Sequence, residues 1–221
     1  RKLRETLGIE VISHELSEIF TRSQQVHDGA VQETIKELTQ VARGRVEISE
    51  RDLKMSASIY LALRTFAKEH NYDALAVSDW PAFQSELKIH PGMAFSWLDE
   101  HDHIPVASEG DVLGAATMLM INAVNQDQAM LLDMNDIDEE RDAVLMWHCG
   151  GSPLGFANNE GVHWKNHSTL GRKSNQPPMG AVADFVFRPQ SVTITRLAND
   201  AQQLLVLEAD IIESPHKGYD G

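Results

Sequence analysis

The sequence predicts an α/β protein, with a Rossmann-like doubly wound parallel sheet followed by a β-rich, barrel-like partial domain. Two apolar runs, residues 73–78 and 104–107, alternate with helical patterns, which is typical of βαβ units. Later in the chain the helical pattern stops, and β-rich runs follow one another with only turns between them. We therefore expect a Rossmann-like α/β domain over residues 1–127 and the first part of a β-rich domain over residues 128–221.

The beginning of the chain carries mainly helical patterns. Leu7–Ile12 is a short apolar stretch that predicts a strand, and Ser13 is placed to cap a helix beginning at the next residue. A second helical pattern covers residues 31–38. Ser49 starts a variant of the capping box with Asp at its fourth position, and the helix behind it is expected to run to about His70.

The middle of the chain alternates between strand and helix patterns. The run at residues 73–78 predicts a buried parallel strand, and a short helix is expected at Phe83–Leu87. Ile104–Ala107 predicts the next strand, and Val112–Val124 is apolar nearly all round, which predicts a helix buried on most faces. A charged loop is expected at residues 136–141. Further strands are expected at Ala129–Asp133, Ala143–Trp147, Ala181–Phe187, Ser191–Arg196 and Leu204–Ile212.

Two acids, Glu109 and Asp133, stand where apolar runs give way to turn residues. In open α/β sheets, ligands bind at the carboxyl ends of the strands. Carboxylates suit hard divalent ions such as Mg²⁺ and Mn²⁺, so our central prediction is that these two acids meet and hold one divalent metal ion. The alternative stays open that Glu109 and Asp111 only favour the positive end of the following helix, while Asp133 opens a turn.

Other polar and aromatic residues gather near the same predicted strand ends. His148 ends a strand, and neutral imidazole is a common metal ligand, although a buried structural histidine fits the sequence equally well. Its neighbour Cys149 is expected to be a small buried residue, because free cysteine usually behaves as one. Trp80 could stack on a sugar face, and the loop at Gly150-Gly151-Ser152 could bring backbone N–H groups to a polyhydroxy ligand. His163 and His167 are expected in a loop, because glycine and proline surround them.

The charge balance narrows the class of partner. With 19 Lys and Arg against 33 Asp and Glu, the formal net charge is −14, which argues against binding nucleic acid or an anionic membrane surface. The longest uncharged apolar segment, Val112–Val124, is shorter than the roughly 20 residues that a spanning helix needs. The single cysteine excludes an internal disulfide and fits a reducing compartment, so we expect a cytoplasmic protein with a small-molecule partner.

Four segments together resemble the L-fucose/L-arabinose isomerase family. In order along the chain they are SHELSEI (Ser13–Ile19), DALAVSDWP (Asp73–Pro81), PVASEGDVLGAATMLM (Pro105–Met120) and LLDMND…VLMWHCGGSP (Leu131–Pro153). The third segment is the most specific, because the family carries a metal-binding Glu in an equivalent EGD or END turn. The family's second carboxylate ligand follows about one helix and one strand later, as Asp133 does here.

The resemblance implies a metal-dependent aldose–ketose isomerase that acts on a pentose or a 6-deoxyhexose through an enediol. It assigns catalytic and metal-binding roles to Glu109 and Asp133, a metal or substrate contact to His148, and substrate contacts to Trp80, Asp79 and Ser152. It also implies Mn²⁺ or another divalent cation and a homo-oligomer, trimer or hexamer. By this comparison the chain holds the family's second α/β domain and the first part of its C-terminal domain. We therefore expect a piece of a longer protein, in which the family's last His ligand lies elsewhere.

The chain also departs from the family pattern. Where the family often has cysteine, this chain has Asp79, Gly92 and Ser108. Both predicted metal carboxylates are kept, so metal binding is still expected, but Asp79 leaves the identity of the sugar open. A rival interpretation is a non-catalytic sugar-binding or structural α/β protein that kept the fold and lost the chemistry.

Overall fold

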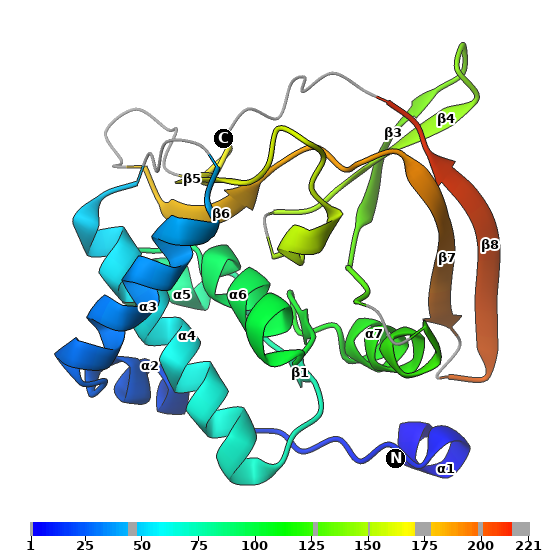
Figure 1. Cartoon of the computed structure of the whole chain (residues 1–221). Coiled ribbons are helices and arrows are strands. Elements are labelled where there is room, and N and C mark those ends of the chain that lie inside the picture. Colours follow the sequence, from blue (N-terminus) through cyan, green and yellow to red (C-terminus); the bar gives the residue numbers. More distant parts are fainter. Residues whose placement is uncertain are drawn as a thin grey trace.

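The computed structural model describes residues 2–43, 48–125, 128–149, 151–170, 178–198 and 201–213. Figure 1 shows a group of helices on one side and two long hairpins on the other. The helices are α1 (Lys2–Leu7), α2 (Leu16–Gln24), α3 (Asp28–Val41), α4 (Glu50–His70), α5 (Ala82–Glu86), α6 (Gly92–Asp102), α7 (Val112–Asn125) and the 3₁₀ turn η1 (Leu154–Phe156). The strands are β1 (Leu75–Ala76), β2 (Val106–Ala107), β3 (Asp133–Asp138), β4 (Ala143–Trp147), β5 (His163–Asn166), β6 (Gly180–Asp184), β7 (Gln190–Ala198) and β8 (Gln203–Ile211).

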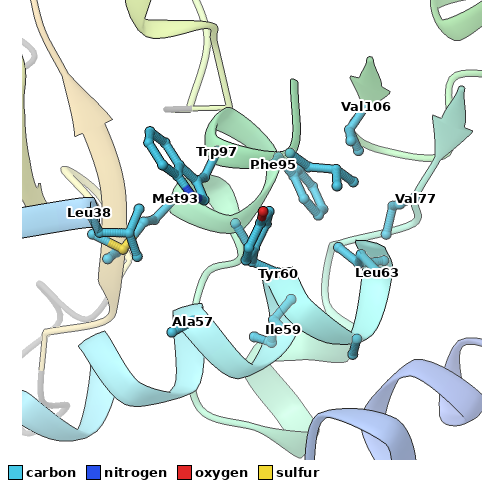
Figure 2. Packing of buried hydrophobic residues seen from close by; sticks show 14 of the residues in the cluster. Leu38, Ala57, Ile59, Tyr60, Leu63, Val77, Met93, Phe95, Trp97 and Val106 are labelled. Carbon is cyan, nitrogen blue, oxygen red and sulfur yellow. The ribbon is translucent and has the colours of Figure 1, made fainter. Parts of the chain in front are cut away.

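The main hydrophobic core lies between α4 and α6. Ser49 caps α4 by accepting a hydrogen bond from the Asp52 N–H at 3.1 Å, which confirms the predicted cap. The buried face of α4 includes Tyr60 and Leu63, and Figure 2 shows Tyr60 between the two helices, close to Phe95 of α6. Fully burying an aliphatic or aromatic side chain contributes about 1.5–3 kcal/mol. Packing between these two helices therefore provides a rigid base for the loops that follow β1 and β2.

The chain before α2 differs from its prediction. Leu7 ends α1 and the following residues form no strand, so the strand predicted at Leu7–Ile12 is wrong. Val11 and Ile12 are 48% and 55% exposed, and an apolar run without a pairing partner gains too little to form a strand. α2 is preceded by Glu15, whose side chain makes no cap hydrogen bond, so the predicted cap at Ser13 is also wrong.

A short parallel pair links the middle of the chain. β1 and β2 pair in parallel through Leu75↔Val106 and Ala76↔Ala107. The pairing continues where the Val77 N–H donates to the Ala107 carbonyl at 2.8 Å. Both strands therefore end at the same edge, where the segments beginning at residues 78 and 108 emerge. The wider doubly wound sheet and the division into two domains at residue 127 stay predictions.

α7 follows the second of these loops and has the predicted extent. Only residues 114–118 are buried, and Val124 is 82% exposed, so the prediction of burial on most faces is wrong for its second half. Its first half packs against β7, where the Leu197 N–H donates to Thr117 Oγ1 at 3.1 Å. Arg196 also forms two hydrogen bonds to Asp111, at 2.6 and 3.2 Å. The β7–β8 hairpin is therefore joined to the loop that leads into α7.

The remaining strands form three antiparallel pairs, and since β5 begins at His163, the loop predicted at His163 is wrong. β5 pairs with β6 and β7 pairs with β8. In the pair β3–β4, Asp133 lies opposite Trp147, so Asp133 begins a strand. The strand predicted at Ala129–Asp133 and the charged loop at residues 136–141 are therefore wrong in placement. β3 is exposed along its whole length, and its polar sequence has no apolar pattern that would predict a strand. Backbone pairing with the more apolar β4 defines it as one.

No helix in the described ranges is both long and apolar enough to cross a bilayer.

Candidate active site

The loop after β2 carries Glu109 in an unusual backbone conformation. Glu109 has a φ of 57° and Gly110 a φ of 70°, so two successive residues are left-handed. This conformation costs a residue with a side chain about 1–2 kcal/mol. The Glu109 N–H donates to Asp79 Oδ1 at 2.6 Å, and the Gly110 N–H donates to the Val77 carbonyl at 2.9 Å. These contacts with the loop after β1 stabilise the turn and leave Glu109 itself exposed.

Asp79 lies beneath this turn and is only 1% exposed. Burial by itself raises the pKa of Asp79, but contact with His90 and the backbone hydrogen bond from Glu109 outweigh it, so the pKa lies below its ordinary value. His90 Nε2 lies 3.5 Å from Asp79 Oδ2. Asp79 is therefore an ionised, buried carboxylate whose oxygens face the protein.

His148 follows β4 and lies close to Asp133 and to Ser108, the residue before Glu109. Its Nε2 is 3.1 Å from Ser108 Oγ and 4.0 Å from Asp133 Oδ2. Burial lowers the pKa of His148, while the charges of Asp133 and Glu109 act in the opposite direction without overcoming it. The imidazole is therefore neutral near pH 7, the form that can ligate a metal.

The strand register explains how Asp133 reaches this place. Because Asp133 pairs with Trp147, it lies beside His148, the next residue along the chain. Ser108 contacts the same imidazole nitrogen, so the loop that carries Glu109 also reaches His148. Asp133 therefore joins the site from the start of a strand, although the sequence analysis expected it at the end of one.

Asp133 and His148 are close enough to share a divalent cation, although Glu109, Asp133 and His148 do not form a group of three ligand atoms within 4.8 Å of one another in the described part of the chain. Two ligand atoms that are each about 2.1 Å from one ion can be at most about 4.2 Å apart, and Asp133 Oδ2 and His148 Nε2 are within that limit. His148 Nδ1 faces the Cys149 sulfur at 3.6 Å, which allows either tautomer, and the Ser108 hydroxyl can rotate away from Nε2. The Asp133 side chain is 62% exposed, so an ion could enter from solvent.

The same residues do not form a nucleophilic triad. In a Ser-His-Asp triad, the serine and the aspartate contact different imidazole nitrogens. Here Ser108 and Asp133 both face Nε2. Asp111 has another task, because its Oδ1 accepts the Gly114 N–H at 2.8 Å at the start of α7. The helix-end alternative therefore describes Asp111 well.

A second group of potential ligands lies deeper. His90, Cys149 and His167 each offer a ligand atom, and these atoms lie within 4.8 Å of one another. The approach of His167 depends on contacts between distant segments, since the His167 N–H donates to the Met179 carbonyl at 2.7 Å. Burial raises the pKa of the Cys149 thiol to about 12, and the charge of Asp79 adds to the shift.

The hydrogen bonds of the two histidines do not favour a metal at this second group. Nδ1 of His90 accepts the Gly92 N–H at 3.1 Å, and Nδ1 of His167 accepts the Thr169 and Leu170 N–H groups at 3.1 and 3.2 Å. A nitrogen that accepts an N–H carries no proton, so the proton of the neutral imidazole is on Nε2. A metal at Nδ1 would displace these donors, and a metal at Nε2 would need the proton moved to Nδ1.

The other predicted substrate contacts lie in different surroundings. Trp80 is 55% exposed, as a side chain that stacks on a sugar should be. Asp79 and Ser152 are buried, 1% and 7% exposed. The loop that carries Ser152 is anchored where Glu100 Oε2 accepts the Leu154 and Gly155 N–H groups at 2.8 and 3.1 Å. Gly150 of the same loop lies outside the described residues.

No protein-family model matches the chain. Curated relatives named sulfoquinovose isomerase, from Priestia aryabhattai and Priestia megaterium (strain ATCC 12872 / QMB1551), are 27% identical over 226 residues. The match covers 98% of this chain and 48% of each relative. A protein of the same name from Alkalicoccus urumqiensis is 26% identical over the same shares. The chain thus spans about half the length of the curated relatives it matches. These relatives are named as sugar isomerases, which agrees with the resemblance at that level, but they do not confirm the L-fucose/L-arabinose family.

Proposed function

We propose that the protein is a metal-dependent aldose–ketose isomerase and that this chain supplies both of its catalytic carboxylates, Glu109 and Asp133. The observation that carries the proposal is the approach of two segments to His148. Asp133, which begins β3, and Ser108, the residue before Glu109, lie 4.0 and 3.1 Å from His148 Nε2. The similarity to sugar isomerases over 98% of the chain supports the same reaction.

The reaction moves a proton between C2 and C1 of the sugar by way of an enediol. The C2 proton is only weakly acidic, and a divalent cation held by Glu109, Asp133 and His148 would supply charge stabilisation worth several kcal/mol. A carboxylate within hydrogen-bond reach of the carbon then takes the proton and returns it to the neighbouring carbon. Glu109 and Asp133 are both exposed, so both can reach a sugar that lies over the site.

The surroundings of the two acids suit this task. His148 stays neutral, because burial lowers its pKa, and so it offers a lone pair without adding a positive charge. Trp80 projects from the loop after β1 and offers an exposed ring face for the apolar side of a sugar. We propose Trp80 as a substrate contact and Ser152 as a residue that shapes the loop beside it.

We propose a 6-substituted aldohexose as the substrate. The relatives are named for sulfoquinovose, a glucose in which a sulfonate replaces the 6-hydroxyl. The sequence resemblance implies a pentose or a 6-deoxyhexose, and sulfoquinovose, which lacks the 6-hydroxyl, favours the second of these classes. As further parts of the proposal, the cation is Mn²⁺ or a similar ion, and the protein is a cytoplasmic homo-oligomer.

The test uses the intact natural protein and two conservative variants, Glu109→Gln and Asp133→Asn. Each removes one charge with little change in size. We expect kcat to fall by about 10³-fold or more, since a loss of roughly 4 kcal/mol in transition-state stabilisation corresponds to that factor. Turnover is measured with Mn²⁺ on a panel of aldoses and ketoses that includes sulfoquinovose, and bound metal is counted by elemental analysis.

Matched controls remove a charge elsewhere. Asp136→Asn lies on the same exposed strand as Asp133, and Glu208→Gln lies on exposed β8. Both should keep wild-type metal content and turnover. Full activity in either site variant contradicts the proposal. Sugar binding by a wild-type protein that holds no metal and turns over no sugar of the panel would instead support the non-catalytic alternative.

A further inference from the structure

Asp79 is the least exposed acid near the proposed active site, and the proposed reaction does not use it directly. It is 1% exposed, whereas Glu109 and Asp133 are both open to solvent. A carboxylate with so little exposure cannot reach a sugar bound over the site. Its burial beside the loop that carries Glu109 therefore needs an explanation other than a substrate contact.

The two oxygens of Asp79 have different partners. Oδ1 accepts the Glu109 N–H at 2.6 Å, a short bond to a charged acceptor, and such bonds are stronger than neutral ones. Oδ2 faces His90 Nε2 at 3.5 Å. Because Nδ1 of His90 accepts the Gly92 N–H, the proton of the ring is on Nε2, directed at Asp79. Asp79 is therefore fixed on one side by the start of α6 and on the other holds the backbone of Glu109.

The backbone of Glu109 needs this support because of its conformation. A residue with a side chain rarely adopts the φ of 57° found here, and the following Gly110 is also left-handed. An ordinary extended or helical conformation at Glu109 would point the carboxylate in another direction. The bond from Asp79 favours the observed turn over those alternatives.

The base of this support is also fixed. Asp79 begins the turn that continues through Trp80 and Pro81. The side-chain amide of Gln84, in the orientation that satisfies both of its ends, donates to the carbonyls of Asp79 at 2.9 Å and Pro81 at 3.1 Å. The turn after β1 is therefore held by α5 as well as by the start of α6. Because the turn is fixed, the hydrogen bond from Glu109 to Asp79 also fixes the backbone of Glu109.

We propose that Asp79 is a positioning residue that holds the Glu109 carboxylate in place for the cation. The inference rests on the proposed function, because it assumes that Glu109 is a ligand. Asp79 acts through the backbone of Glu109 and touches neither sugar nor cation. This role replaces the substrate contact that the sequence resemblance implies for Asp79.

The test measures Mn²⁺ affinity of the metal-free intact protein, a property separate from turnover. Mn²⁺ is titrated and the free ion is followed by electron paramagnetic resonance. Asp79→Ala removes the acceptor, and we expect the dissociation constant to rise about 10- to 100-fold, the range found when an outer partner of a metal ligand is lost. Asp79→Asn keeps an uncharged oxygen acceptor, so its dissociation constant should rise about threefold to tenfold and lie between those of wild type and Asp79→Ala.

A matched control separates positioning from a loss of stability. Asp52→Ala also removes a buried carboxylate, 5% exposed, but Asp52 lies at the start of α4 and its carboxylate pairs with Arg51. It should lower the melting temperature without changing Mn²⁺ affinity. A wild-type dissociation constant in any folded Asp79 variant overturns the inference, and if Asp79→Ala does not fold, Asp79→Asn decides. If Glu109→Gln also leaves the affinity unchanged, the proposed function fails as well. If only the Asp79 variants do so, only the positioning role fails.

Discussion

Two carboxylates of the core, Asp79 and Asp99, are both 1% exposed but differ in their ionisation. The pKa of Asp79 lies below its ordinary value. Burial and the nearby charge of Glu100 raise the pKa of Asp99 to about 7, with only the Gln128 amide acting in the opposite direction. Within the described part of the chain, neither carboxylate oxygen of Asp99 has a hydrogen-bond partner.

The difference shows that partners, rather than burial, decide the charge of a core acid here. Asp79 receives an N–H from Glu109 and faces the protonated nitrogen of His90. Asp99 lies in the middle of α6, where the helix uses its own backbone donors, so no N–H is left for its side chain. One acid is therefore ionised beside the proposed active site, whereas the other, inside the helix layer, keeps its proton up to about pH 7.

The alkylation rate of Cys149 should show the largest effect, because the pKa of its thiol depends on burial and on the charge of Asp79. Burial and the negative charge of Asp79 raise the pKa of its thiol to about 12. At pH 8 alkylation by iodoacetamide should be slower than that of a free thiol by a factor on the order of 100 or more, because only the thiolate reacts. Cys149 is the single cysteine, so mass spectrometry of the intact protein measures the rate directly. Asp79→Asn should speed the reaction severalfold. Rapid alkylation of the wild type at pH 8 would contradict a buried thiol that lies near an ionised Asp79 and binds no metal ion.

Asp99→Asn should stabilise the protein at high pH. The folded-state pKa of about 7 lies above the ordinary 3.8, so the folded state holds the proton more tightly, and stability falls as pH rises from about 4 through 7. The variant avoids that loss, and we expect a gain of up to about 4 kcal/mol at pH 8 that disappears near pH 4. Denaturant unfolding of the intact protein at both values measures it. The exposed Asp73→Asn is the control, and an equal gain at pH 4 and pH 8 would exclude ionisation of Asp99 as the cause.

Asp79→Asn should have the opposite effect on stability. A carboxylate whose pKa is lowered on folding stabilises the protein above its ordinary pKa, and this contribution is lost as pH falls through the folded-state value. Hydrogen bonds to charged groups contribute about 1.5–3 kcal/mol, so we expect a loss of about 1.5 kcal/mol at pH 7. The same unfolding measurement, repeated near pH 3, should show a smaller difference. A variant more stable than wild type at pH 7 would contradict the comparison.

Glu100→Gln should give the smallest effect. It removes the charge that adds to the raised pKa of Asp99, while its remaining oxygen can still accept the Leu154 and Gly155 N–H groups. The midpoint of the pH-dependent stability loss should move down by roughly half a pH unit. A midpoint that moves upward would mean that Glu100 acts on Asp99 in some other way.

Parts of the site were predictable from the sequence because they depend on local order. The apolar run before Ser108 ends as expected, and Glu109 follows it at the edge of the β1–β2 pair. Asp133 was expected near Glu109 for a reason that the structure corrects, since it starts β3. The polar, exposed β3 carries no apolar alternation, so only pairing with β4 reveals its register.

Other parts depend on contacts between distant segments and could not be read in advance. His167 reaches His90 because the His90 N–H and carbonyl pair with Gly180 and Ala181, at the start of β6. No residue spacing encodes that approach. The burial of Asp79 is of the same kind, because the adjacent Trp80 is exposed and both residues belong to one turn.

The β7–β8 hairpin has a practical consequence. Both faces of β8 expose apolar side chains. About half of each side chain is exposed in Leu204 (48%), Leu205 (50%), Val206 (54%) and Leu207 (49%). Long, apolar outer strands invite other chains to add to them. A recombinant protein of these 221 residues alone should therefore aggregate at moderate concentration. Detergent, or substitution of Leu204 and Val206 by lysine, should keep it in solution.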